Sequence, residues 1–183
     1  MLARARRALR AFREETAADL NLVRARHARA GRRFPALATC GDMSAAALVL
    51  LRTSIALRRA VGTACGTRAV LRWGFHIDVW TDAIGPGLSL PHPFNIVIGS
   101  GVQIGSGCTL LHNVTIQHAA ATRIGDGVTL AVGSVVLADR SIGTGAFCGA
   151  NSVVTRDVPR AAVVAGVPAR VIRVEEPRSV AHA

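Results

Sequence analysis

A six-residue repeat of apolar residues is the feature that most restricts what this chain can fold into. It runs from Ile84 to Val154, and all twelve of its lead positions are apolar. Two offsets of two residues interrupt the frame, and glycine follows the lead residue in half of the repeats. A six-residue period fits neither an α-helix nor a simple hairpin meander, because it requires one inward residue per short strand and a turn to the next strand. The lead residues are Ile84, Leu90, Ile98, Ile104, Leu110, Ile116, Ile124, Leu130, Val136, Ile142, Cys148 and Val154.

The repeat predicts a triangular coil of three short strands, in which equivalent lead residues of successive turns stack into a dry column. The predicted fold is therefore a mainly β, hexapeptide-repeat β-helix of about four coils, preceded by a small α-helical segment. A prism this slim buries little surface by itself, so assembly with further copies of the chain is expected. The alternative is a glycine-rich β-sandwich with accidental spacing, and the strictness of the frame argues against it.

The N-terminal part of the chain shows a helical pattern instead. Alanine, leucine and arginine dominate it, and apolar residues recur at steps of three and four. The second helix, from about Ser44 to Val61, is apolar on nearly all sides and should pack against protein, with its arginines facing solvent or other subunits. We therefore predict an α-helical region over residues 1–73, a β-helix over 74–173 and a flexible tail over 174–183.

The charge of the chain is strongly positive but unevenly distributed. The net charge is +11, all 22 basic residues are arginines, and residues 1–72 hold 15 of them against 4 acidic residues. Residues 73–183 are neutral, with 7 arginines and 7 acidic residues. Tyrosine is absent and aromatic residues make up only 4% of the chain, so no stacking platform accompanies the arginines. The pattern argues against a nucleic-acid partner.

Two further observations concern the compartment. The longest apolar run falls well short of the ~20 residues that a membrane span needs, and the N-terminus lacks the apolar core of a signal peptide. The four cysteines show no CxxC spacing, so reduced, packed thiols are expected. These features predict a cytoplasmic protein without a membrane span. The cysteines are Cys40, Cys65, Cys108 and Cys148.

Four segments on this frame resemble the hexapeptide-repeat acyltransferases, and among them the serine acetyltransferase-like branch. The segments are Asp78 to Gly85, Leu90-Pro-His-Pro-Phe-Asn-Ile-Val-Ile-Gly99, His112-Asn-Val-Thr-Ile116 and Ala165-Gly-Val-Pro-Ala-Arg-Val-Ile172. The resemblance covers roughly residues 74 to 173. It implies a left-handed β-helix, a homotrimer, and acetyl-CoA bound as co-substrate between adjacent prisms, with no metal.

His92 matches the catalytic base of these enzymes. It lies in an interruption of the repeat, where two added residues should push the chain outward and expose the ring. Acetyl transfer to a hydroxyl needs a base near pH 7, which histidine provides. Asp78, fourteen residues earlier, resembles the aspartate that orients this histidine, and Asp82 is a second candidate.

The resemblance also suggests residues that bind the substrates. His112, and less directly His118, are candidates for the acceptor side. Position matching places contacts with the pantetheine arm of the cofactor at Ala131, Gly149 and Ala150. Guanidinium groups suit the phosphates of coenzyme A, and those near the closing loop belong to Arg156, Arg170 and Arg173.

The chain departs from the serine acetyltransferase pattern at two places that concern serine itself. An Arg-His-Pro triplet that holds the carboxylate of serine is replaced by Ala120-Ala121-Thr122, and the aspartate that precedes the catalytic histidine is replaced by Pro91. Burying an unpaired zwitterion would cost several kcal/mol. We therefore expect a hydroxyl acceptor without the charges of serine, such as a sugar. Serine O-acetyltransferase activity in cysteine biosynthesis is the alternative.

Assembly is also expected to differ from that of the family. The helical part is shorter than the one that joins two trimers there, which favours a plain trimer. The tail from Glu175 to Ala183 lacks the final isoleucine by which those enzymes dock onto their partner enzyme, so no cysteine-synthase complex is expected.

Two other classes of function fit the same scaffold. A γ-type carbonic anhydrase binds zinc through three histidines, and His92, His112 and His118 supply the residue type. The six-residue step from His112 to His118, however, moves the second ring onto the next face of the prism. A non-catalytic scaffold protein that kept the prism is the third reading.

Overall fold

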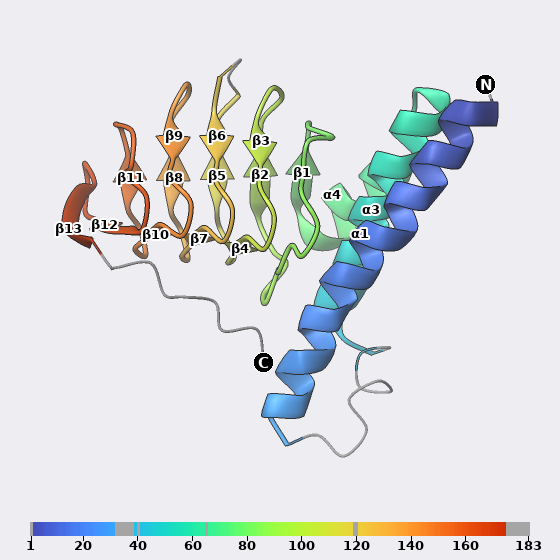
Figure 1. Ribbon diagram of the computed structural model, residues 1–183, viewed down its shortest axis with the longest axis horizontal. Helices are drawn as coiled ribbons and strands as arrows, with labels where there is room; N and C mark the ends of the chain where they lie inside the picture. Colours follow the sequence, from blue (N-terminus) through green and yellow to red (C-terminus); the bar gives the residue numbers. More distant parts are fainter. Residues whose placement is uncertain (1, 32–38, 40, 65, 119–120, 175–183) are drawn as a thin grey trace.

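The computed structural model describes residues 2–31, 39, 41–64, 66–118 and 121–174. A helical part and a parallel β-helix follow each other along the chain, and the helices pack at the end of the prism where its first coil lies (Figure 1). The helices are α1 (Leu2–Arg29), α3 (Met43–Val61) and α4 (Thr67–Phe75). The tail predicted over 174–183 lies, apart from its first residue, outside the described residues.

Within the described residues, thirteen short strands form the three faces of the prism. Sheet A has the order β1-β2-β5-β8-β11, sheet C the order β13-β12-β10-β7-β4, and sheet B the order β3-β6-β9. All neighbours pair in parallel except β12 and β13, which are antiparallel and close the far end. The strands are β1 (Ile77–Val79), β2 (Ile96–Ile98), β3 (Gln103–Ile104), β4 (Thr109–Leu110), β5 (Thr115–Ile116), β6 (Arg123–Ile124), β7 (Thr129–Leu130), β8 (Val135–Val136), β9 (Ser141–Ile142), β10 (Phe147–Cys148), β11 (Val153–Val154), β12 (Ala162–Ala165) and β13 (Arg170–Val174).

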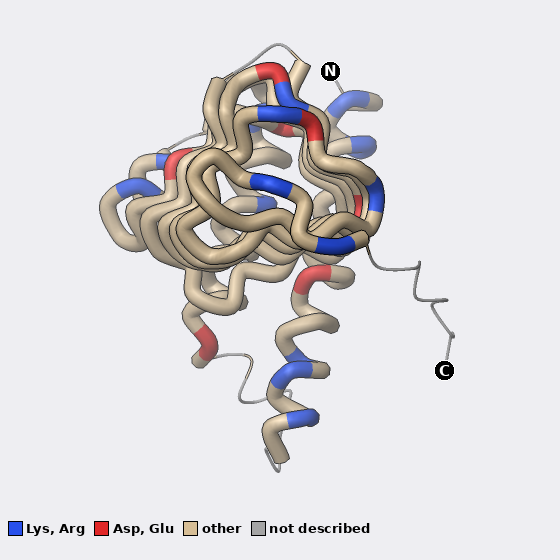
Figure 2. The backbone as a smooth tube through the Cα atoms, turned by 90° about the vertical axis from the view of Figure 1, so that its left-hand side faces the viewer, with Lys and Arg blue, Asp and Glu red and all other residues tan. Residues whose placement is uncertain are grey.

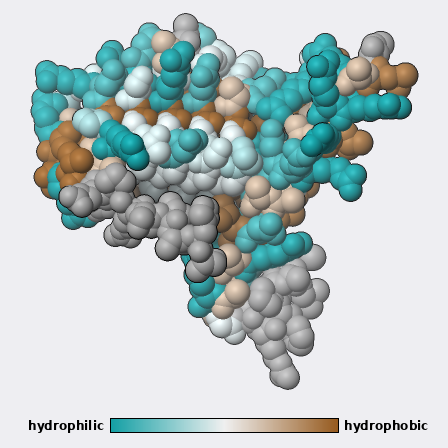
Figure 3. Space-filling view, viewed as in Figure 1, coloured by the Kyte–Doolittle hydropathy of each residue, from teal (hydrophilic) through white to brown (hydrophobic). Residues whose placement is uncertain are grey.

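The repeat predicted from sequence is confirmed as the frame of the β-helix. Lead residues stack on one another in register, as Ile98 does on Ile116 and Leu110 on Leu130, and every lead residue is buried. Viewed along the prism, the coils superimpose as three-sided turns with charged residues on the outside (Figure 2). Figure 3 shows a hydrophobic stripe that crosses successive coils along the prism.

The number of coils is larger than the four predicted, since sheets A and C each contain five strands. The count from sequence missed β1 because its lead residue, Val79, lies five residues before Ile84 and so outside the six-residue frame. It also missed β12, because the six-residue frame stops at Val154. The next inward residue, Val158, which pairs with Ile142, follows after only four residues. The turns at the two ends of the prism therefore break the frame that the middle obeys.

Close stacking of the coils requires glycine at some turns. At Gly99, a Cβ atom would lie only 2.3 Å from the backbone nitrogen of His118 in the next coil. A side chain there would force two coils apart. This is the physical reason for glycine directly after a lead residue.

Arg52 of α3 joins the helical part to the first coil. Its side chain is fully buried and donates to both carboxylate oxygens of Asp19, at 2.7 and 3.1 Å, and to Glu15 of α1 at 2.9 Å. It also donates to the carbonyl oxygens of Ile84 and Gly85, at 2.9 and 2.7 Å. The expectation that the arginines of the second helix face solvent or other subunits is therefore wrong for Arg52. Its guanidinium can be buried because the buried carboxylate of Asp19 pairs with it.

None of the helices in the described part of the chain is long and apolar enough to cross a membrane.

Removing Arg52 should strongly destabilise the protein. Arg52→Ala leaves the buried carboxylate of Asp19 without its ionic partner, and such a loss typically lowers the free energy of unfolding by about 3–5 kcal/mol. Urea denaturation followed by circular dichroism measures the change. Arg10→Ala, which removes only the exposed ion pair with Glu14, should leave the midpoint unchanged. Equal midpoints for the two variants would contradict this role of Arg52.

Candidate functional site

Five of the predicted site residues lie along one edge of the prism, where sheet C turns into sheet A. We call this edge, formed by residues 91–95, 111–114, 131–134 and 149–152, the CA edge. Each segment connects a strand or bridge of sheet C to the next strand of sheet A, so equivalent turns stack in a column. The structure thus brings together, on successive coils, His92, His112, Ala131, Gly149 and Ala150.

His92 and His112 are neighbours at this edge. Their ring centroids lie 5.7 Å apart, and the ring planes are nearly perpendicular, at 86°. His92 is exposed, as the interruption of the repeat predicted, whereas His112 is half-buried. The Nδ1 atom of His112 is buried and has no hydrogen-bond partner in the described structure. The arrangement presents one accessible imidazole with a second imidazole beside it.

Asp78 is bound to a different group from the one predicted. Its Oδ1 accepts a hydrogen bond from Arg68 of α4 at 2.9 Å, and the Arg68 guanidinium lies 3.1 Å from the centroid of the Trp80 ring. Burial alone would raise the pKa of Asp78, but the hydrogen bonds from Arg68 and Trp80 outweigh it and lower this pKa. Among the described residues no hydrogen bond joins Asp78 to His92, so that pairing stays a prediction.

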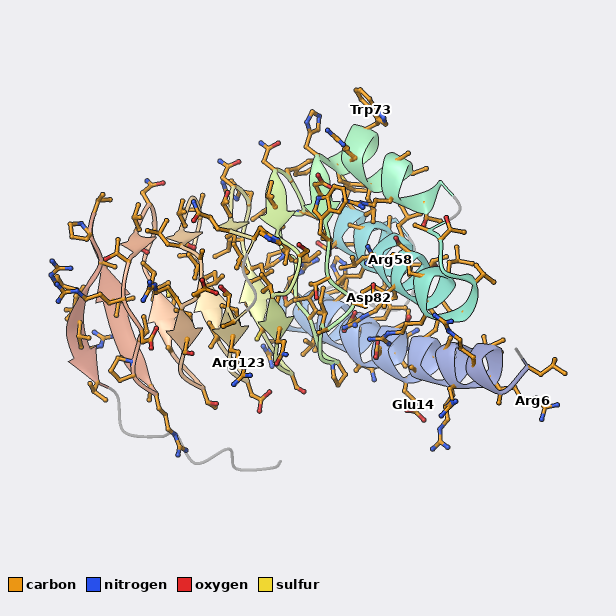
Figure 4. The ribbon with its side chains drawn as sticks, turned by 90° about the horizontal axis from the view of Figure 1, so that it is seen from above. Arg6, Glu14, Arg58, Trp73, Asp82 and Arg123 are labelled. Carbon is orange, nitrogen blue, oxygen red and sulfur yellow. The ribbon has the colours of Figure 1, made fainter. Side chains whose placement is uncertain are left out.

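The second candidate, Asp82, is also paired with arginine. Its Oδ1 lies 2.7 Å from Arg58 Nη2, and the two side chains are labelled close together in Figure 4. Both candidate carboxylates therefore contact the helical part of the chain.

His118 and Arg156 lie on another edge, where sheet A turns into sheet B. The Nδ1 atom of His118 is hydrogen-bonded to the hydroxyl of Ser100 in the preceding coil. Strand β5 separates His118 from His112. Within the described residues no three histidine, cysteine or acidic side chains are grouped closely enough to hold a metal ion. The three histidines considered for zinc do not form one cluster.

The replaced triplet supplies no charge in its described part. Ala120 lies outside the described residues. The backbone N–H of Ala121 donates to Asp139, and Thr122 is fully buried. Arg123 is exposed on the outer face of sheet B, on the side of the prism opposite Trp73 (Figure 4).

Arg170 lies at the closing end of the prism. The loop 166–169 between β12 and β13 is held to β11 by two hydrogen bonds, from Ala169 N to the Val153 carbonyl at 2.8 Å and from Val153 N to the Gly166 carbonyl at 3.0 Å. Arg170 and Arg173 follow this loop on β13, next to the end of the CA edge. Their place suits a contact with a long ligand that extends along that edge.

A groove of about 630 Å³ on the outer face of sheet B was not predicted from the sequence. The outward residues of β6 and β9, Arg123 and Ser141, are part of its lining. Asp126 and Asp157 are also part of its lining. The groove lies away from His92, and no motif in the sequence marked it.

Comparisons with known proteins agree with the resemblance. The chain is 41% identical over 109 residues to serine acetyltransferase 2 of Arabidopsis thaliana, a match that covers 56% of this chain and 34% of that protein. It is 37% identical over 106 residues to a serine acetyltransferase of Buchnera aphidicola, covering 54% of this chain and 39% of the relative. The chain thus spans well under half of these relatives. No protein-family model matches it.

Solved structures give the same answer for the fold. A serine acetyltransferase in complex with CoA superimposes with a TM-score of 0.69 at 25% identity, covering 92% of this chain and 72% of that one. The soybean serine acetyltransferase apoenzyme gives a TM-score of 0.70 at 26% identity, covering 88% and 69%. The fold is therefore the left-handed parallel β-helix preceded by helices.

The contacts of Asp78 predict how its carboxyl titrates. We expect its pKa to lie below the ordinary value of 3.8 in the folded protein and to rise towards that value in Arg68→Ala. A lowered pKa stabilises the folded state above the ordinary value, and this contribution is lost as the pH falls through the lowered value. Carboxyl-detected NMR titration measures both proteins. The same Asp78 pKa in both would show that Arg68 does not hold this carboxylate.

The repeat frame, the motifs and the three-dimensional fold all resemble those of the serine acetyltransferases. The closing loop and the His92 segment occupy the positions that the motifs assign to them on the frame. This chain is similar to the serine acetyltransferases in sequence and shares their hexapeptide-repeat β-helix fold.

Proposed function

We propose that the protein is an acetyl-CoA-dependent O-acetyltransferase that uses the CA edge as its active site. The observation that supports this most directly is the placement of an exposed imidazole, His92, on the same edge as the turns at Ala131, Gly149 and Ala150. Serine acetyltransferase relatives, one of them solved with CoA, support the same reaction class.

In the proposed reaction His92 is the general base. Its ring takes the proton from the acceptor hydroxyl while the oxygen attacks the thioester carbonyl of acetyl-CoA. Collapse of the tetrahedral intermediate breaks the carbon–sulfur bond, and the imidazolium returns the proton to the departing thiolate. Backbone N–H groups at tight turns of the edge are suited to stabilise the intermediate oxyanion. Asp78 is kept as the candidate that steadies the charged ring in the assembled enzyme.

Direct transfer is favoured over an acyl-cysteine intermediate. Burial raises the pKa of the Cys148 thiol to about 12, and burial also raises the pKa of Cys108. Neither thiol ionises near neutral pH, and the thiolate is the nucleophilic form. Both side chains face the dry core of the prism.

We propose a homotrimer in which sheet A faces the neighbouring protomers. The outward residues of its strands stack in one column, and three of the five are valines: Asp78, Val97, Thr115, Val135 and Val153. Val97 is 40% exposed in the single chain. Packing this column against other copies would remove apolar surface from water and place the adjoining CA edge in a crevice between protomers. In this arrangement the crevice would also be approached by the side chains of Arg156, Arg170 and His118. We propose the cytoplasm as the location of the protein.

For the acceptor we propose a hydroxyl compound without the charge pattern of serine, such as a sugar. Pro91 offers no carboxylate beside His92, and the described residues Ala121 and Thr122 offer no cation. Serine is the second candidate, because relatives that match over more than 100 residues include serine acetyltransferases.

A thioester-release assay tests the activity and its acceptor together. The purified protein and acetyl-CoA are combined with serine, homoserine, amino sugars and neutral sugars, and free CoA is measured with a thiol reagent. We expect release with at least one sugar and markedly less with serine, because a zwitterion would be bound without charged partners. Serine activity equal to that of the best sugar would contradict the acceptor assignment.

The variant His92→Ala provides the control for the base. Loss of a general base lowers the rate about 10²–10⁴-fold, while circular dichroism should stay unchanged because the side chain is exposed. His76→Asn is the control, because it removes an exposed histidine ring at the end of α4, outside the proposed site, and should have a much smaller effect. Full activity of His92→Ala would refute the mechanism.

A further inference from the structure

The loop that carries His92 has few hydrogen-bond donors of its own. Pro91 and Pro93 flank the histidine, and neither has a backbone N–H. The loop must therefore be held mainly through its carbonyl groups, which need donors from elsewhere. The carbonyl of His92 accepts from Phe94 N at 2.9 Å, and that of Phe94 accepts from Asn113 N in the next coil at 3.0 Å. The carbonyl of Pro91, directly before His92, is left for a partner outside the β-helix.

That partner is Ser44, at the start of α3. Its hydroxyl donates to the Pro91 carbonyl oxygen at 3.2 Å, and the residue is only 2% exposed. The contact joins residues 47 positions apart in the sequence, so it links the helical part directly to the loop. Since a carbonyl can only accept, the Ser44 hydroxyl is the donor in this contact, and the Asp42 carboxylate is a second acceptor for the same hydroxyl.

Ser44 is itself fixed from two sides. Arg26 Nη2 of α1 lies 3.2 Å from the Ser44 hydroxyl oxygen and 2.7 Å from Asp42 Oδ2. Asp42 caps α3 by accepting from the backbone nitrogens of Ser44 and Ala45, at 2.7 and 3.3 Å. Because a guanidinium only donates, the hydrogen bonds run in one direction, from Arg26 to Ser44 and from Ser44 to Pro91.

The other end of the loop is also held by the helical part. The N–H of Asn95 donates to the carbonyl of Phe75, the last residue of α4, at 3.2 Å. The rings of Phe75 and Phe94 lie 6.1 Å apart. Helices α3 and α4 thus hold the loop before and after His92.

We infer that Ser44 is a positioning residue, whose hydrogen bond to Pro91 fixes the backbone before His92 and so places the imidazole beside His112. The inference rests on the proposed role of His92 as the base. It gives the helical part of the chain a function in the reaction, through a group that does not touch the substrates.

The test compares Ser44→Ala, Ser44→Thr and Ser54→Ala. Ser54 is a matched control, because it is also a serine of α3 that is 2% exposed. With acetyl-CoA and the best acceptor of the panel, we expect Ser44→Ala to lower kcat about ten- to a hundredfold without changing the KM for acetyl-CoA, as misplacement of a catalytic group does. Ser44→Thr keeps the hydroxyl and should recover most of the rate, and Ser54→Ala should retain it.

A measurement independent of activity separates this inference from the proposed function. In ¹⁵N-histidine NMR spectra, Ser44→Ala should shift or broaden the ring signals of His92 and leave those of His118, on the other edge, unchanged. Unchanged His92 signals, or an equal loss of rate in Ser54→Ala, would overturn the role of Ser44. If His92→Ala kept its activity, the proposed function would fail, while the His92 signals would still show whether Ser44 positions the ring.

Discussion

The register between coils is the constraint on which the rest of the structure depends. In the middle of the prism, strands of one face pair in parallel with strands 18 or 20 residues further on, as Val97 does with Thr115 and Gln103 with Arg123. At the two ends the paired residues are 19 and 16 positions apart, as Ile77 and Ile96 or Phe147 and Val163 are. The longer step occurs where the chain between two paired strands contains one of the two interruptions of the repeat. Because the inward lead residues remain in register across these steps, the additional residues are confined to the edges. Chemistry can therefore be placed at an edge without disturbing the core.

One of these interruptions carries His92, and the turns stacked on it at the CA edge place other residues close to its ring. The turn below contributes His112, and the next two turns contribute the small residues Ala131, which is buried, and Gly149 and Ala150, which are partly or fully exposed. At this edge Asn95, Asn113 and Asn151 adopt a left-handed backbone conformation, with φ of 54°, 61° and 54°, and Gly133 does so at 68°. Asparagine and glycine tolerate this region better than other residues, which keeps the turns alike.

The sequence was sufficient to predict the prism, because the six-residue period identifies the inward residue of each strand. This needs no information on which residues are in contact in the folded chain. It also placed His92 in an exposed loop, since two added residues have no room in the core. It could not predict the contacts of Asp78 with Arg68 or of Ser44 with Pro91, because neither helix carries a pattern that specifies which coil it packs against. The burial of Arg52 was missed for the same reason, as its carboxylate partner lies 33 residues away on another helix.

If acetyl-CoA meets His92 at the CA edge, a crystal structure of the protein with bound CoA should show it. We expect the pantetheine arm along the turns at Ala131, Gly149 and Ala150, with the sulfur beside the ring of His92. CoA bound instead in the groove on sheet B, with its sulfur remote from that ring, would rule out the CA edge as the active site.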